Sequence, residues 1–233
     1  MELFDLTNQE RKNTGLNLLT RNSYLDLAAE LKLNDMVTNN YWSHDNPKNF
    51  EPWIFFHKVG YTYLYAGENL ARGYTISKSI LRDWMASEKH KENILKKEYT
   101  EMGISLKKGK LDGKDYFIVV QLFAKPIKPV EDLRLVATEI DKKIVQDYLS
   151  NLNLSRESWA TNNEIYSIKD IDILIDNFDR RIQLCKTIIR NFDSKNYSEP
   201  DILSLWNEIV KISNESTVKI NEIIAEWDGV ENQ

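Results

Sequence analysis

The sequence of 233 residues contains a single cysteine, Cys185, and this scarcity excludes two classes of protein. No disulfide can form within the chain, so the fold has to be stabilised by its hydrophobic core. A zinc site of the zinc-finger type, which needs several cysteine or histidine ligands at short spacings, is also excluded. Because Cys185 lies among aliphatic residues, we expect it to be a small buried hydrophobe and not a nucleophile.

The sequence also lacks a long hydrophobic run. No stretch approaches the roughly 18 apolar residues that a transmembrane helix needs, so we expect no transmembrane segment. The hydrophobic fraction of 42% and the mean hydropathy of −0.51 are typical of a soluble globular protein. Residues 1–5 have neither the basic nor the apolar region of a signal peptide, and the chain as given predicts none. An earlier removal of a leader or anchor is left open.

A third absence is a concentrated basic stripe, which argues against a nucleic-acid partner. The net charge is −5, and residues 131–233 hold the excess of carboxylates, whereas residues 1–130 are slightly basic and hold most of the aromatic side chains. This difference predicts two domains. Two prolines in residues 125–129 indicate a stiff connection. We place a first domain at residues 1–126, a linker at 127–130, and an acidic α-helical domain of unknown role at 131–233.

Hydrophobic periodicity gives a coarse secondary structure for the first domain. Apolar residues at helical spacing predict helices over residues 25–36 and 76–95. Residues 99–106 and 116–123 read as the strands of a hairpin, with a turn over residues 107–114. The second strand is apolar almost throughout, which predicts a sheet covered by helices on both faces.

Helix starts are marked at three places. Residues 7–10 fit a capping box, and residues 167–170 and 198–200 carry a serine in the position of an N-cap. Two apolar stripes follow the latter two starts. We therefore expect the second domain to be a helical hairpin or a small helical bundle.

Residues that could carry chemistry are few, because the sequence has no nucleophile elbow, no zincin helix and no phosphate-binding glycine loop. His44 follows the aromatic Tyr41 and Trp42, Glu68 follows a glycine, and His90 lies in a charged helical run. Two imidazoles and one carboxylate in a shared cleft could hold a divalent cation or act in acid–base chemistry. Taken singly, the simpler interpretations are a surface histidine, a solvated loop glutamate and a solvated helix face. His57 is expected to be structural.

The spacing of His90 supports the simpler interpretation for this residue. On a continuous helix, the six positions that separate it from Trp84 turn it by roughly 120°, away from the apolar face. The residues alone indicate a two-domain α/β protein with a candidate His/Glu cleft.

The order of the motifs resembles the CAP superfamily (cysteine-rich secretory proteins, antigen 5 and pathogenesis-related 1), in particular its short bacterial branch of the YkwD or SCP-like type, over residues 3–126. The matching segments are Asn8-x-x-Arg11, Gly15-Leu16, Leu25-x-x-Ala28-Ala29, Tyr41-Trp42-Ser43-His44, Gly60-Tyr61, Gly67-Glu68-Asn69-Leu70-Ala71, Trp84-Met85-x-Ser87-x-x-His90-x-x-Asn93-Ile94-Leu95, Tyr99-Thr100-Glu101-Met102-Gly103-Ile104 and Gln121-Leu122-Phe123-Ala124. The resemblance implies an α+β fold, an α–β–α sandwich with a central antiparallel sheet, followed here by the all-α tail.

The resemblance also implies a site. The family cleft gathers two histidines and two acidic residues, which in some members bind zinc or another divalent cation. His44 and His90 correspond to the two histidines and Glu68 to one acid, and these three residues are the candidate catalytic and metal-binding set. The second acid corresponds to Ser87, so this chain keeps three of the four groups.

Three functions follow from these residues, and the sequence leaves open whether the protein is an enzyme. We favour a non-enzymatic binding module, secreted or at the cell envelope by resemblance, for a cell-wall glycan or peptidoglycan fragment, a lipid or a peptide. Ligand contacts are expected from Trp42, Tyr61, Tyr65, Asn69 and Ser87, with further aromatic walls at Tyr41, Tyr63 and Tyr74.

The first alternative is a metal-dependent hydrolase directed at protein or glycan, with His44 and His90 as ligands of zinc or another divalent cation. Glu68 would then be the general base or the third ligand. The second alternative assigns the function to the helical tail. The apolar stripe through Ile171 and Phe178 would bind a protein partner or a second copy of the chain.

Overall fold

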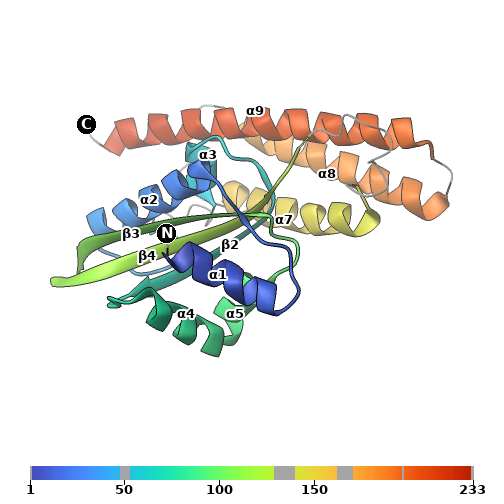
Figure 1. Ribbon diagram of the computed structural model, residues 1–233. Coiled ribbons are helices and arrows are strands. Elements are labelled where there is room, and N and C mark those ends of the chain that lie inside the picture. Colours follow the sequence, from blue (N-terminus) through green and yellow to red (C-terminus); the bar gives the residue numbers. More distant parts are fainter. Residues whose placement is uncertain (1, 48–52, 129–139, 162–169, 196, 232–233) are drawn as a thin grey trace. The chain divides into compact units, whose positions relative to one another are not determined.

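The computed structural model divides the chain into two compact units, the first ending at Pro126 and the second beginning at Ile127 (Figure 1). Each unit is described by itself below. The structure describes residues 2–47, 53–128, 140–161, 170–195 and 197–231, the last six of these without their side chains.

The first unit has five helices and four strands among the described residues. In chain order they are α1 (Glu2–Asn13), β1 (Thr20–Arg21), α2 (Ser23–Thr38), α3 (Ile54–Lys58), β2 (Tyr63–Arg72), α4 (Ser77–Ala86), α5 (Glu88–Leu95), β3 (Glu101–Leu111) and β4 (Lys114–Pro126). The strands form one sheet in the order β1-β3-β4-β2. The three long strands pair antiparallel and the short β1 pairs parallel with β3, so β2 lies at an edge of the sheet.

Helices cover the sheet on both faces, as expected for an α–β–α sandwich. Helix α2 packs on β3 and β4, whereas α1, α4 and α5 contact one another and lie on the opposite side of the sheet (Figure 1). The central strand β4 is buried from Ile118 to Ala124, which confirms the expected burial on both faces. Gly103 allows α2 to approach, because a Cβ there would lie 2.2 Å from the carbonyl carbon of Leu25.

The predicted hairpin is confirmed, but its turn is tighter than expected. Strands β3 and β4 continue to Leu111 and from Lys114, and only Asp112 and Gly113 join them. Both of these residues have positive φ angles, 50° and 75°, as a two-residue turn of type I′ requires. The lysines on either side therefore belong to long strands and not to a loop.

Two helix predictions for the first unit are wrong. The helix expected over residues 76–95 is interrupted at Ser87, whose φ and ψ of −96° and 124° are extended, so α4 and α5 are separate helices. The capping box at residues 7–10 does not start a helix, because α1 already begins at Glu2. Inside that helix the Thr7 hydroxyl donates to the Leu3 carbonyl at 2.8 Å.

The second unit is helical, as predicted, and contains α7 (Lys142–Thr161), α8 (Ile171–Ser194) and α9 (Glu199–Glu231). Helix α8 packs against both α7 and α9. The start predicted at residue 198 is confirmed, since the Ser198 hydroxyl accepts from the Asp201 amide at 3.3 Å. Of the pair expected to begin α8, Asp170 is the residue before the helix, and Ser167 lies outside the described residues.

The apolar stripe of α8 is buried and is not an open docking surface. Ile171, Phe178 and Ile182 are 5%, 2% and 4% exposed, and Cys185 is fully buried among them. Burial raises the pKa of the Cys185 thiol to about 12, which agrees with its expected role as a small hydrophobe. None of the helices among the described residues combines the length and the apolar composition needed to span a membrane.

Candidate functional site

A polar cluster fixes the segment that follows α2 and carries His44. The Asp35 carboxylate accepts hydrogen bonds from the Tyr41 hydroxyl and, at 2.8 Å, from the Asn46 amide. The Lys32 ammonium donates to the His44 carbonyl at 2.8 Å and to the Tyr41 hydroxyl at 3.1 Å. Both ends of the segment are therefore bound to α2, and Lys32 of that helix fixes the backbone of His44.

Lys32 contributes to the candidate site and was not among the residues predicted from the sequence. Its side chain is fully buried, and its ammonium lies 4.8 Å from the ring centroid of Tyr41 and 5.7 Å from that of Phe55. Burial lowers the pKa of Lys32, whereas the carboxylates of Glu68 and Asp35 act in the opposite direction. A lysine at an apolar position of the α2 periodicity is the one sequence signal that could have drawn attention to it.

Glu68 lies on the edge strand β2 and not in a solvated loop. Its side chain is only 6% exposed, and Oε1 is 2.6 Å from His44 Nδ1. The glycine before it permits a close approach, because a Cβ at Gly67 would lie 2.1 Å from the hydroxyl oxygen of Tyr99. That hydroxyl donates to the Ala66 carbonyl at 2.9 Å, which anchors the same strand.

The pair with Glu68 determines which nitrogen His44 presents outward. A carboxylate only accepts hydrogen bonds, so Nδ1 of His44 donates to it, and Nε2 is the nitrogen left for a ligand. The hydrogen bond to Glu68 raises the pKa of His44, against the opposing effect of partial burial. The imidazole is 55% exposed, so the charge it carries faces solvent.

His90 is the second imidazole of the site. Its Nδ1 is 2.9 Å from the Ser87 hydroxyl, and its ring centroid lies 6.2 Å from that of Trp84. Burial lowers the pKa of His90, and the positive charge of His44 lowers it further. The structure thus brings the two histidines into one electrostatic neighbourhood, with their pKa values moved in opposite directions.

A buried network of amides supports this arrangement. The Asn93 side chain donates to the Glu68 carbonyl and to the Asn69 side-chain oxygen, both at 3.0 Å. Asn69 in turn donates to the His90 carbonyl at 3.3 Å and to Gln121 Oε1 at 3.2 Å. Asn69 is fully buried, so it links β2 to α5 and to β4 and offers no surface to a ligand.

Arg11 fixes the end of the helix that carries His90. Its guanidinium donates to the carbonyls of Ile94 and Lys96 at 2.9 and 2.8 Å, and to that of Tyr99 at 3.3 Å. These carbonyls lie at and beyond the C-terminus of α5, where no amide within the helix is available to them. Arg11 is fully buried and was present in the family motif, although its role could not be read from it.

The predicted aromatic residues differ in what they offer. Tyr61 and Tyr65 are 7% and 6% exposed, and the Tyr61 hydroxyl donates to the Glu101 carboxylate at 2.7 Å. Both tyrosines therefore have little surface for a ligand. Trp42 is half-buried, and the Arg72 guanidinium lies 4.9 Å from its ring centroid.

The donor set fits a metal ion poorly. Glu68 already binds His44, and Ser87, which binds His90, supplies no carboxylate. Over the described parts of the chain, no three His, Cys, Asp or Glu side chains are grouped so as to hold a metal. Protein zinc sites generally use three or four side chains, and only two imidazoles remain here.

A comparison with protein families identifies the family to which the chain belongs. The family model described as "CAP: Cysteine-rich secretory protein family" matches residues 4–123. The chain belongs to the CAP family. The membership inferred from the order of the motifs is therefore confirmed, and the match ends before the second unit of this CAP protein begins.

Two curated relatives come from Bacillus subtilis strain 168. The CAP chain is 35% identical to uncharacterized protein YkwD over 103 residues, which cover 44% of this chain and 40% of YkwD. It is 30% identical to uncharacterized membrane protein YlbC over 105 residues, 45% of this chain and 30% of YlbC. The chain thus matches less than half the length of either relative.

Two solved structures are also similar to it. One is an extracellular protein containing a SCP domain from Bacillus anthracis, with a TM-score of 0.46 and 30% identity over 53% of this chain and 39% of that one. The other is an outer surface protein from Borrelia burgdorferi, with a TM-score of 0.45 and 23% identity over 53% of this chain and 90% of that one.

Proposed function

We propose that this CAP protein is a non-enzymatic binding module that acts outside the cell or at the cell envelope. The description of its family as secretory supports the location. The observation that carries the binding role is the 2.6 Å contact between His44 Nδ1 and Glu68 Oε1. This contact makes the buried carboxylate an orienting group for the imidazole, so Glu68 is not free to serve as a general base.

The ligand class follows from the groups that remain exposed. His44 carries positive charge more readily than an ordinary histidine and suits an anionic or acceptor-rich group. The half-buried Trp42 offers an aromatic surface on which a sugar or an aliphatic group can pack. A peptidoglycan fragment combines sugars with carboxylates and meets both requirements, and we take it as the ligand before a lipid or a peptide.

The test is calorimetric titration of the full chain with soluble muropeptides, followed by mass spectrometry of the recovered ligand. We expect saturable binding and an intact ligand. The variant His44→Ala/His90→Ala should weaken binding at least tenfold, whereas the control Lys107→Gln, an exposed residue of β3, should leave it unchanged. Glu68→Gln should reduce affinity only modestly. Cleavage of the ligand by wild type, abolished in Glu68→Gln, would contradict the proposal.

A metal-dependent hydrolase is the alternative that we carry forward. One observation favours it, because a carboxylate that accepts from the far nitrogen of an imidazole is the usual support of a metal-binding histidine. Glu68 would then orient His44 and would be neither general base nor third ligand. Elemental analysis of protein purified without chelator decides: one equivalent of zinc, lost in His44→Ala/His90→Ala, supports this alternative, and a metal-free protein after zinc titration rejects it.

A further inference from the structure

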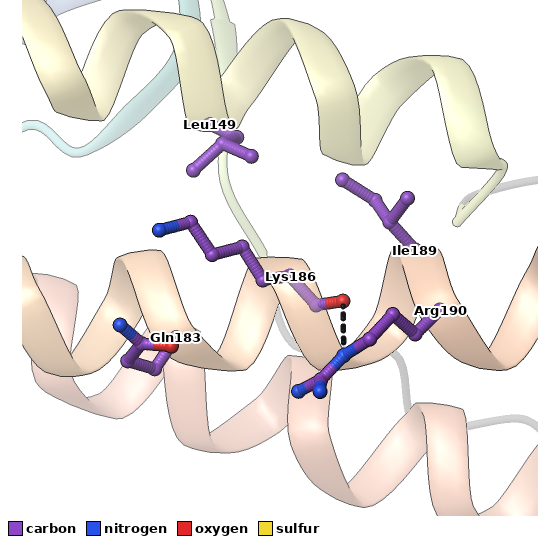
Figure 2. A pocket seen from close by; sticks show the side chains of 5 residues that line it. All are labelled: Leu149, Gln183, Lys186, Ile189 and Arg190. Carbon is purple, nitrogen blue, oxygen red and sulfur yellow. Dashed lines mark hydrogen bonds between the residues drawn. The ribbon is translucent and has the colours of Figure 1, made fainter.

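A hollow in the second unit lies along the seam between α7 and α8, in a part of the chain that the family match does not reach. Its volume is about 410 Å³, within the range of small-molecule sites. Figure 2 shows Leu149 of α7 and Ile189 of α8 pointing into the seam, with the polar side chains on the α8 side. The lining residues are Leu149, Gln183, Lys186, Ile189 and Arg190.

Ion pairs bridge the seam on either side of this hollow. Toward one end, Lys142 of α7 pairs with Asp193 of α8. Toward the other end, Arg156 of α7 donates to Asp179 of α8, with 2.9 Å between Nη2 and Oδ2. In both pairs α7 supplies the cation and α8 the carboxylate. In the hollow between these two ion pairs the cations come from α8 instead. Helix α8 supplies Lys186 and Arg190 to the lining, whereas α7 supplies the aliphatic Leu149.

The two cations of the hollow lack a carboxylate partner in the described part of the chain. Arg190 donates only to the Lys186 carbonyl at 3.3 Å and to the Thr187 hydroxyl at 3.2 Å. The Lys186 ammonium makes no hydrogen bond or ion pair there, and its charge acts only at longer range on Asp179, which Arg156 already binds. Among the described residues of this acidic domain, two neighbouring cations therefore have no carboxylate partner.

We propose that this hollow binds a small carboxylate that carries a short aliphatic chain. The carboxylate lies between Lys186 and Arg190 and supplies the anion that α7 does not. The chain packs on Leu149 and Ile189, and the Gln183 amide can donate to the second carboxylate oxygen. This site is independent of the His44–Glu68 pair, so the two proposals fail or succeed separately.

The test is a ¹H–¹⁵N NMR titration of the full chain with octanoate. We expect saturable shifts of the amide signals of Leu149, Lys186 and Ile189, with a dissociation constant on the order of 1 mM for a ligand of this size. Lys186→Gln/Arg190→Gln should weaken binding at least tenfold. The matched control Lys143→Gln/Lys211→Gln removes the same charge from exposed, ion-paired lysines of the unit and should change it less than twofold.

Two further probes separate the components of the ligand. Octan-1-ol keeps the chain without the charge, and acetate keeps the charge without the chain, and each should bind at least tenfold more weakly than octanoate. Equal binding of octan-1-ol would reduce the site to an apolar groove, and equal binding of acetate would reduce it to a surface anion patch. Either result, or unchanged octanoate affinity in Lys186→Gln/Arg190→Gln, overturns the proposal.

Discussion

Arg11 and Lys32 in the first unit and Arg181 in the second are all nearly or completely buried, yet they are stabilised differently. The first two donate to backbone carbonyls at 2.8–3.3 Å. Arg11 thereby fixes the C-terminal end of α5, and Lys32 fixes the segment that follows α2. Among the described residues, Arg181 donates only to the hydroxyls of Tyr148 and Ser213, at 3.3 and 3.4 Å, and to a carbonyl of its own helix, and its Nη2 has no hydrogen-bond partner there.

The difference separates two ways of building a core. In the first unit, buried charge specifies one backbone arrangement, because several carbonyls depend on a single side chain. In the second unit, apolar stripes determine the packing of the helices, and the buried arginine is an addition to that packing. The comparison therefore predicts that equivalent substitutions have unequal consequences in the two units.

The largest effect is expected from Arg11→Met, which keeps much of the side-chain volume. It leaves the carbonyls of Ile94, Lys96 and Tyr99 without their donor, and we expect a loss of about 3 kcal/mol in the free energy of unfolding of the first unit. Urea denaturation followed by circular dichroism measures it. A loss below about 1 kcal/mol would mean that water replaces the guanidinium and that the buried charge specifies little.

A smaller effect, on protonation, is expected from Glu68→Gln. Removing the carboxylate should lower the pKa of His44, and the weaker charge on His44 should in turn raise the pKa of His90. Histidine ring signals followed by NMR against pH measure both. The control Asp115→Asn, at an exposed position of β4, should leave both histidines unchanged. Unaltered titration of His90 would show that the imidazoles do not share a site.

The same pair links stability to pH. The raised pKa of His44 contributes stability that is fully present below about pH 6.5 and is lost as pH rises through the folded-state value. The lowered pKa of His90 acts in the opposite direction, since its neutral form must be protonated as pH falls. In Glu68→Gln, the stabilisation of wild type that depends on a protonated His44 should disappear.

The smallest effect is expected from Arg181→Met in the second unit. Its polar contacts are long and one nitrogen is unpartnered, so an apolar side chain of similar length should change the free energy of unfolding by less than about 1 kcal/mol in either direction. Urea denaturation of the full chain followed by circular dichroism checks this, in parallel with Arg11→Met. A loss as large as that in Arg11→Met would remove the distinction between the units.

The sequence pointed to the residues of the candidate site more readily than to their surroundings. His44, Glu68 and His90 stand in motifs whose order resembles a known family, and the structure places His44 against Glu68 and within the electrostatic reach of His90. Strand β2 was missed because buried polar residues interrupt the alternation that marks a strand. Lys32 was missed because its partners lie in a segment that only the fold brings beneath its helix.

The amide network could not be predicted for a related reason. Asn69 and Gln121 are 52 positions apart and meet only because β2 and β4 pair in one register, which a single sequence does not reveal. The second unit was easier, since apolar stripes at helical spacing are a local property. What the sequence could not supply there was the order of charges along the seam, which depends on how α7 and α8 face each other.

The break at Ser87 has a consequence for how such a site can change over evolutionary time. Because α4 and α5 are joined by a single extended residue, inserting or deleting one residue there would change the position of His90 relative to Trp84 while every reactive side chain stayed the same. The length of the connection between α4 and α5 therefore affects the direction in which the His90 imidazole points. Divergence among homologous sites can therefore begin at a connection that carries no chemistry of its own.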